Sequence, residues 1–294
     1  MKKSVFFLPL MALSVAFLAA CSDDSSSGSN PDATDPGLSS SSIDMQAPTS
    51  SDITPTESSS SEVPEYVDPA SLVPDEKGFV DIQLVYRSLQ PNEKAVFAIR
   101  HAERDPSVTR ESPLSEDGEE QALEVGRKLV GPDEFTYTHT DFVRTYKTCL
   151  NIATGRGQAT FPNDTNDIFT ESWFISNDSL YKEYSSQQNN SRVVIASWSY
   201  NGEFADAFYD YNEKNAEMVK MLAGDYATAS RVRIVCSHDN FLVPLAVYLT
   251  NKAVDIKLFE RNVWLNYLAG VAIITNDAGA QRFYAVKGLN SGVR

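Results

Sequence analysis

The sequence of 294 residues has few of the side chains that hold metal ions or disulfide frameworks, namely three cysteines and three histidines. It contains no CxxC pair, no cluster of metal-ligating residues and no internal repeat. These absences exclude a disulfide-rich scaffold, a structural zinc module and a repeat protein. We therefore expect a protein that needs neither a metal ion nor another cofactor.

The N-terminus lacks an apolar run of membrane-spanning length. The run from Val5 to Phe17 is too short, because a span needs about 20 residues. Lys2 and Lys3 precede it and "LAAC" follows it, which is the pattern of an export signal. Small residues before a lone cysteine resemble the lipobox of bacterial lipoproteins, in which acyl chains on the cysteine, here Cys21, anchor the protein. An ordinary secretory signal with an incidental cysteine is the alternative.

Basic residues are missing from the segment that follows. Residues 22–76 contain twelve Asp and Glu, no Lys or Arg, and much Ser and Pro. Such a composition cannot form a core, so we expect a signal peptide at 1–20, a disordered tether at 21–76 and one folded domain at 77–294. The tether carries most of the net charge of −15, and hence the acidity says little about the substrate. Ser22 resembles lipoproteins that pass to the outer membrane, so we expect a protein of the cell envelope that contacts the membrane through its lipid anchor alone.

The domain alternates apolar runs of strand length with amphipathic helical segments. "AVFAI" (95–99) has the pattern of a strand buried on both faces, and Ser115 stands as the N-cap of a helix. Further strands are expected near 135–138, 231–237, 270–275 and 282–287, and further helices from about 142 and at 204–224 and 240–250. The alternation indicates a three-layer α/β/α sandwich with a mainly parallel sheet. In such sheets ligands bind at the carboxyl ends of the strands.

A polar segment at 154–202 interrupts this alternation. It is rich in Asn and Ser and carries aromatic residues such as Trp173 and Trp198. We expect an inserted cap over the sheet edge, and an insertion that merely lies on the surface is the alternative.

Two cysteines, Cys149 and Cys236, fall within the domain. An oxidising compartment would allow them to pair. A domain of this size does not need one disulfide for stability, so the sequence favours two buried thiols.

Charged side chains gather where strands are expected to end. Arg100, His101 and Arg104 follow the first buried strand, His238 follows "RIVCS", and Arg144 lies near the start of a helix that also follows a strand. Because the carboxyl ends of parallel strands share one edge of a sheet, these side chains are expected to converge. Arginine presents a fork of donors that matches phosphate oxygens. The set therefore predicts a pocket for a doubly charged tetrahedral anion.

Four segments, in this order, resemble the histidine phosphatase superfamily, which has the phosphoglycerate mutase-like fold. "RHAERDP" is similar to the RHGxRxP signature of its acid phosphatase branch, with Ala102 in place of glycine. "SPLSEDGEEQA" resembles the segment that follows in the family, "FVRTYKT" its arginine-bearing helix, and "SHD" its second histidine with the aspartate of that branch. These segments span Arg100 to Asp239. The methyl group of Ala102 is expected close to the bound phosphate, where it would narrow the pocket.

The resemblance implies a metal-independent phosphomonoester hydrolase that works through a phosphohistidine. It implies His101 as the catalytic nucleophile, and Arg100, Arg104, Arg144 and His238 as the phosphate-binding residues. A histidine that attacks phosphorus has to be neutral, and neighbouring cations lower its pKa. The same cations stabilise the negative charge on the transferring phosphoryl group.

The general acid is less well defined by the sequence. The resemblance to the acid phosphatase branch implies Asp239, which follows His238 at a strand end. The other branch uses a glutamate from the segment after the arginine-bearing helix, and Glu171 or Glu183 could fill that role. Asp239 may instead cap the helix that begins near Phe241.

Two other functions compete with hydrolysis. A phosphomutase would return the phosphoryl group to a substrate, and an inactive relative would only bind a phosphorylated ligand at the cell surface. The expected partner is a phosphorylated small molecule, with sugar phosphates, inositol phosphates, nucleotides and phosphoproteins all left open. Basic residues are too scattered for nucleic-acid binding. His139 has no motif match and is expected to be structural.

Overall fold

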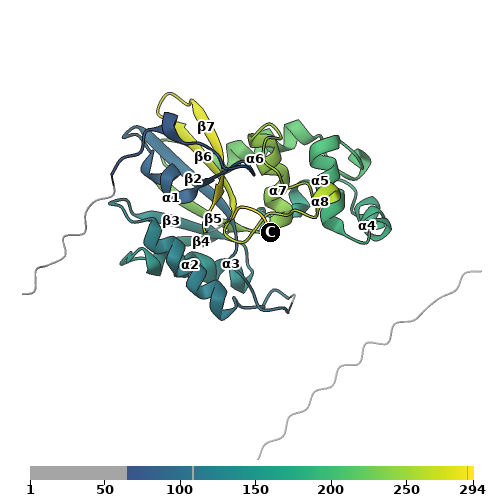
Figure 1. Cartoon of the computed structure of the whole chain (residues 1–294), viewed down its shortest axis with the longest axis horizontal. Helices are drawn as coiled ribbons and strands as arrows, with labels where there is room; N and C mark the ends of the chain where they lie inside the picture. The colour runs from purple at the N-terminus through teal and green to yellow at the C-terminus, as the bar shows by residue number, and fades with distance from the viewer. Residues whose placement is uncertain (1–64, 108, 290) are drawn as a thin grey trace, which may run out of the picture. The chain divides into compact units, whose positions relative to one another are not determined.

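The computed structural model describes residues 65–107, 109–289 and 291–294 (Figure 1). The expected signal peptide, Cys21 and most of the expected tether lie outside these residues. Within the described part, no helix has both the length and the apolar character that crossing a membrane requires.

Seven strands form one sheet, in the order β1-β7-β6-β2-β5-β3-β4. Their bounds are β1 Phe79–Asp81, β2 Glu93–Arg100, β3 Phe135–His139, β4 Asn163–Thr165, β5 Val232–Ser237, β6 Gly270–Asn276 and β7 Gln281–Lys287. β6 pairs antiparallel with both β2 and β7, whereas the other pairs are parallel. The predicted mainly parallel sheet is therefore confirmed.

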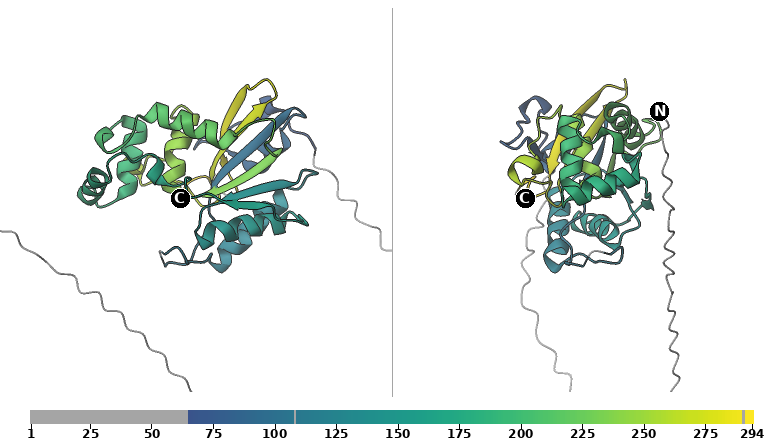
Figure 2. Two further views of the ribbon diagram at one scale, coloured as in Figure 1. Left: turned by 180° about the vertical axis from the view of Figure 1, so that it is seen from behind. Right: turned by 90° about the vertical axis from the view of Figure 1, so that its right-hand side faces the viewer.

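Helices cover both faces of the sheet (Figures 1 and 2). Their bounds are α1 Ile82–Arg87, α2 Glu116–Lys128, α3 Val143–Gly155, α4 Asp178–Gln187, α5 Ser191–Asn201, α6 Tyr211–Ala223, α7 Asp239–Leu249 and α8 Leu258–Arg261. Alternate side chains of β2 enter two separate cores. Phe97 and Ile99 pack with residues of α1, α2 and α3, while Val96 and Ala98 pack with residues of α5, α6 and α7. This is the predicted three-layer sandwich.

The helix ends follow local capping chemistry. Ser115 caps α2 as predicted, because its side chain accepts a hydrogen bond from the Gly118 backbone N–H. The helix expected at 204–224 begins later, at Tyr211, where the Asp210 side chain accepts bonds from the first turn. The earlier start was wrong because residues 205–207 form a separate 3-10 turn.

The segment at 154–202 contributes to the sheet through β4 and to the helical layer through its helices, so it is not a superficial insertion. It contains β4, a 3-10 turn at Glu171–Trp173, α4 and α5. Trp198 and Tyr200 of α5 are buried in the core that α7 also enters, and α5 packs on α7. Figure 2 shows this helical group beyond the end of the sheet.

Close helix contact fixes the position of α3. A side chain on Gly126 of α2 would collide with the backbone of Ile152, and one on Gly155 would collide with the backbone of Leu123. Glycine therefore lets α2 and α3 approach at backbone distance. This holds Arg144, near the start of α3, in a defined place.

Several segments near the edges of the domain have fixed contacts. Asp75, which we expected within the tether, accepts hydrogen bonds from the backbone of Lys77 and Phe79 and pairs with Lys287 at 2.8 Å.

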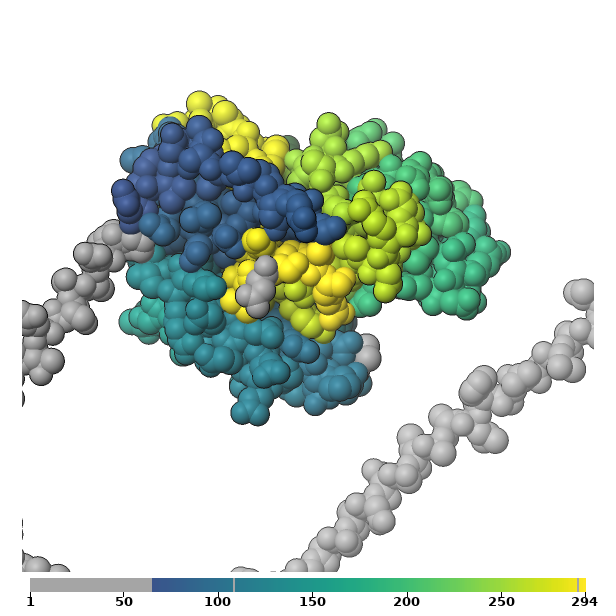
Figure 3. Space-filling model, viewed as in Figure 1, coloured from purple at the N-terminus to yellow at the C-terminus, as the bar shows by residue number. Residues whose placement is uncertain are grey.

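Cys149 and Cys236 are both buried and free, as the sequence favoured. In Figure 3 the C-terminal segment (yellow) lies beside the segment around α8 (yellow-green).

Candidate active site

Strand ends bring the two predicted histidines together. His101 follows β2 and His238 follows β5, and these strands are parallel neighbours in the sheet. The His101 backbone N–H donates to the Ser237 carbonyl at 3.0 Å, and the ring centroids of His101 and His238 lie 5.5 Å apart. The convergence that the sequence predicted at this edge is thus present in the structure.

The ring of His101 is held in one tautomer. Its Nδ1 lies 2.7 Å from the Ala102 carbonyl oxygen, which can only accept, so Nδ1 carries the proton. Nε2 then presents its lone pair. The side chain is 3% exposed, and burial together with the charge of Arg100 holds the pKa of His101 well below its usual value. Both effects favour the neutral imidazole that the sequence led us to expect, and burial is the largest single cause.

Arg144 joins the two histidines. Its Nε donates to His101 Nε2 at 3.2 Å, and its Nη2 lies 3.5 Å from His238 Nδ1. Nη1 donates to the Thr109 carbonyl at 2.9 Å, and the guanidinium lies 4.2 Å from the centre of the Phe142 ring. A planar fork of donors in this position suits several oxygens of one phosphoryl group.

His238 is also neutral. Its Nε2 lies 3.1 Å from Thr140 Oγ1, and its ring packs against that of Phe142. Burial, followed by the charge of Arg144, lowers the pKa of His238 to about 3. At neutral pH it can therefore donate one N–H without adding charge.

Thr148 links the nucleophile loop to the arginine helix. The Ala102 backbone N–H donates to Thr148 Oγ1 at 3.0 Å, and that hydroxyl donates to the Arg144 carbonyl at 2.7 Å. Ala102 itself is fully buried within the apolar cluster that includes Leu114 and Ala122. Its methyl group packs in the core, so the expected narrowing of the phosphate pocket does not occur.

Asp239 is the anionic centre of an ionic network. Its Oδ2 accepts from Arg100 Nη2 at 3.0 Å, from Arg192 Nη2 at 2.8 Å and from Trp264 Nε1 at 2.8 Å. Although burial alone would raise it, the charges of Arg100 and Arg192 hold the pKa of Asp239 below its usual value. Asp239 is the first residue of α7, whose N-cap position is taken by His238, so the alternative in which Asp239 caps this helix is wrong.

Arg100 is buried beside this network. Its Nη1 donates to the Leu265 carbonyl at 2.6 Å, and its guanidinium lies 4.3 Å from the centre of the Tyr267 ring. Burial lowers the pKa of Arg100 to about 10, which leaves it cationic at neutral pH. Its buried Nε has no hydrogen-bond partner within the described residues.

Arg104 bonds backbone carbonyls of its own loop. Its Nη1 donates to the carbonyls of Asp105 at 3.0 Å and Pro106 at 3.3 Å, and it also bonds the Ser107 carbonyl. Its charge nevertheless lowers the pKa of Arg144 after burial, so the two cations are near one another. The structure thus gathers four of the five predicted phosphate-site and nucleophile residues and leaves Arg104 in its own loop.

The two candidate glutamates differ in position. Glu171, in the 3-10 turn after β4, is partly buried and close enough to Arg144 for its charge to raise the pKa of that arginine. Glu183 is exposed on α4 and accepts a hydrogen bond from Gln187. His139 bonds the Thr140 carbonyl and Asn163 and takes no part in the cluster, as expected.

Sequence reasoning missed three residues that shape the site, namely Arg192, Trp264 and Tyr267. Arg192 starts α5 within the segment that carries no motif, and Trp264 and Tyr267 precede β6. The Tyr267 ring lies 5.7 Å from that of His101. "VWLNYLAG" was visible as an aromatic stretch before an apolar strand, but nothing in it showed which site it reaches.

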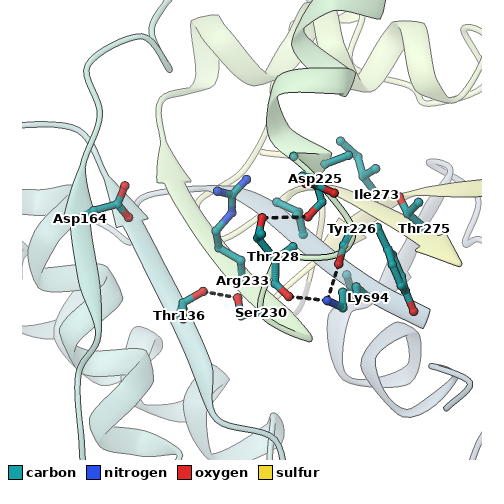
Figure 4. A pocket seen from close by; sticks show the side chains of 15 residues that line it. Lys94, Thr136, Asp164, Asp225, Tyr226, Thr228, Ser230, Arg233, Ile273 and Thr275 are labelled. Carbon is teal, nitrogen blue, oxygen red and sulfur yellow. Dashed lines mark hydrogen bonds between the residues drawn. The ribbon is translucent and has the colours of Figure 1, made fainter. Parts of the chain in front are cut away.

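Metal ligands do not gather among the described residues, where no three His, Cys, Asp or Glu side chains come within reach of one ion. A cavity of about 480 Å³ lies at the other end of the sheet, beside the first residues of β2, β3 and β5 (Figure 4). Its cations Lys94 and Arg233 bond backbone carbonyls of the surrounding chain. It is therefore separate from the histidine cluster.

The chain is similar to one known protein family and to several solved structures. The model of the histidine phosphatase superfamily (branch 1) matches residues 96–286, and no curated protein sequence matches the chain. Among similar solved structures, phosphoglycerate mutase from Bacillus anthracis is 14% identical, with 66% of this chain and 93% of that chain covered and a TM-score of 0.46. YhfR of Bacillus stearothermophilus is 16% identical, with 68% and 98% covered and a TM-score of 0.46. The mycobacterial glucosyl-3-phosphoglycerate phosphatase is 13% identical, with 67% and 100% covered and a TM-score of 0.42.

The matched model agrees with the superfamily that the motifs predicted. It is the model of branch 1 and not of the acid phosphatase branch that "RHAERDP" and "SHD" had suggested. The chain belongs to the histidine phosphatase superfamily, branch 1.

Proposed function

We propose that this protein is a metal-independent phosphomonoester hydrolase that forms a phosphohistidine at His101. The observation that carries the proposal is the state of His101 Nε2. It is an unprotonated lone pair, buried beside the guanidinium of Arg144 and the neutral ring of His238. A nucleophile and the donors that stabilise a phosphoryl group therefore occupy one small volume.

The reaction has two steps. In the first, Nε2 of His101 attacks phosphorus, the ester P–O bond breaks, and the leaving oxygen takes a proton from a general acid. Arg144, the positive charge of Arg100 and the N–H of His238 stabilise the charge on the phosphoryl oxygens. In the second, water attacks phosphorus, its proton returns to the acid, the P–N bond breaks, and inorganic phosphate leaves.

We assign the general acid to Glu171. Asp239 is held as a carboxylate by two arginines, and a group whose pKa is lowered in this way is a poor proton donor. Glu171 is partly buried and close enough to Arg144 for its charge to raise the pKa of that arginine, whereas Glu183 is exposed on α4. Asp239 then serves to position Arg100, and the sequence-based assignment of Asp239 as the acid is not the one that the geometry favours.

We also propose that the enzyme is a lipoprotein of the cell envelope, anchored through Cys21 and facing the periplasm or the exterior. The support is the sequence pattern alone, since Cys21 lies outside the described residues. As a flexible coil, the 43 residues 22–64 that precede the described domain would span roughly 35 Å. The domain would therefore meet soluble phosphate esters.

The proposed hydrolysis is tested by phosphate release from a panel of alkyl and aryl phosphates with the purified full-length protein in detergent. We expect turnover in EDTA and inhibition by vanadate, which mimics the transferring phosphoryl group. Transfer of the phosphoryl group to a second substrate molecule without net phosphate release would identify a mutase. Binding of phosphate esters with no turnover would identify an inactive module.

A further inference from the structure

Another cavity lies beside the network around Asp239. It has a volume of about 240 Å³ and is lined by Asn190, Arg192, Leu258, Asn262, Trp264 and Arg294. None of these lining residues is acidic, although the chain as a whole carries a net charge of −15. Arg192 and Trp264 also contact Asp239, so the cavity borders the network that holds Arg100.

Arg192 faces this cavity with an accessible guanidinium. Its side chain is 37% exposed, although its Nη2 is bonded to Asp239. The Asp239 oxygen that accepts this bond also accepts from Arg100 and Trp264. The carboxylate of Asp239 therefore pairs with two guanidinium groups, and these three groups together carry a net positive charge.

Arg294 adds a third cation. Its guanidinium lies 4.5 Å from the centre of the Tyr267 ring, and Arg100 lies 4.3 Å from the centre of the same ring. The backbone of Arg294 exchanges two hydrogen bonds with that of Trp264, which fixes the segment at the cavity. Among the salt bridges of residues 65–107, 109–289 and 291–294, the Arg294 side chain has no acidic partner. After burial, the charges of Arg294 and Arg192 both contribute to lowering the pKa of Arg100.

We propose that Arg192 and Arg294 form a second anion subsite, so that the preferred substrates are phosphomonoesters carrying another anionic group, a carboxylate or a second phosphate. This inference rests on the proposed function for the place of the scissile phosphate at His101. The Tyr267 ring lies between the two places, 5.7 Å from the ring of His101 and 4.5 Å from the guanidinium of Arg294. A substrate would therefore reach from one to the other along this ring.

Arg192 has a simpler structural use, which is to tie α5 to α7 through Asp239. A structural tie would affect all substrates alike. A subsite would affect the anionic ones selectively, because its cations meet a charge that neutral substrates lack.

The experiment uses the full-length protein and three matched series of increasing chain length. These are phosphooxy carboxylic acids, the phosphate monoesters of the corresponding diols, and the bisphosphates of those diols. We expect kcat/KM for the acid or the bisphosphate to exceed that for the neutral monoester by about tenfold or more at the best length. The series that shows the preference identifies the anion as a carboxylate or a phosphate.

Arg192→Gln and Arg294→Gln should each reduce this preference. Arg294→Gln keeps the Arg192–Asp239 pair, so it remains informative if Arg192→Gln loosens α5. Arg261→Gln is the matched control, because this exposed arginine of α8 pairs with Asp255 outside the cavity. The preference should persist in it.

Equal kcat/KM for neutral and anionic esters at every length, or a preference that survives both substitutions, would overturn the subsite. If no ester is hydrolysed, the proposed function fails separately, and calorimetric binding of the matched phosphonates decides the subsite. Tighter binding of the carboxylated or doubly phosphorylated phosphonate, lost in Arg294→Gln, would support it. Equal binding would refute it.

Discussion

Arg144 donates a hydrogen bond from Nε to Nε2 of His101 across 3.2 Å. The cation that is proposed to bind the phosphoryl group therefore holds the lone pair that is proposed to attack phosphorus. A phosphoryl group entering the site would replace this contact, since its oxygens are better acceptors for a guanidinium than a neutral imidazole is. The nucleophile is released in the same event. Until then, the hydrogen bond from Arg144 keeps the ring of His101 neutral and oriented.

Substitution of His101 tests the nucleophile. His101→Ala should lower kcat by at least about 10⁴-fold, because the substitution removes the nitrogen that is proposed to attack phosphorus. Phosphate release from an aryl phosphate measures the effect, and circular dichroism verifies the fold. His139→Gln is the matched control, since this buried histidine lies outside the cluster and should leave turnover near wild type. Near-normal turnover by His101→Ala would sink the assignment.

The general acid can be located by its dependence on the leaving group. Glu171→Gln should slow hydrolysis of an alkyl phosphate by about 10²- to 10⁴-fold while sparing much of the activity on an aryl phosphate, whose leaving group needs little protonation. Asp239→Asn should slow both substrates alike, because it disturbs Arg100. Glu183→Gln, on an exposed face of α4, is the control. Leaving-group dependence in Asp239→Asn instead would return the acid role to Asp239.

Stability should fall as the pH is lowered below the range of free histidine. The pKa of His238 is about 3 in the folded state and 6.5 by reference, so between these values the unfolded chain binds more protons than the native one. The free energy of unfolding therefore rises with pH in this window and is lost on acidification, by an amount on the order of a few kcal/mol. Urea unfolding between pH 7 and pH 4 measures the slope. His238→Gln should flatten it, and an unchanged slope in that variant would contradict the burial of a neutral ring.

Ala102 should affect stability more than substrate binding. Its methyl group is buried in the apolar cluster with Leu114 and Ala122. Ala102→Gly should therefore reduce the free energy of unfolding by about 1–2 kcal/mol, from lost burial and added backbone entropy. KM for a phosphate ester should stay within about twofold of wild type. A markedly tighter KM would show that the methyl group crowds the phosphate after all.

Cys21 should determine the attachment to the membrane. Cys21→Ser should release the protein from the membrane fraction or leave it unprocessed, because the acyl chains are the proposed anchor. Fractionation with detection of the domain measures this outcome. A correctly processed Cys21→Ser protein that stays in the membrane fraction would refute the lipoprotein proposal.

Sequence patterns located the parts of the site that follow buried strands. His101 and His238 each come directly after an apolar run, and parallel pairing of β2 with β5 then brings them to one edge. The direction of a side chain at a strand end is set by packing, which is why the methyl group of Ala102 was misplaced. Arg104 was misjudged for a related reason, since the carbonyls of its own loop compete for its donors.

Sequence patterns did not predict the part of the site that lies on the helices. Arg192 lies on α5, which no pattern tied to the sheet edge, and only the packing of α5 on α7 brings it to Asp239. A contact between two segments that are distant in the chain produces no periodic sequence pattern in either segment. The boundary of α6 was missed because a 3-10 turn and a helix share the same apolar composition.

The shared carboxylate of Asp239 also bears on how this enzyme could be rebuilt. The Asp239–Arg192 pair crosses the junction between the α4–α5 segment and α7. Grafting that segment from a relative without an equivalent arginine would leave the carboxylate with one cation, Arg100, instead of two. An exchange of this segment would therefore have to transfer Arg192 and Asp239 together, because neither residue keeps this ion pair without the other.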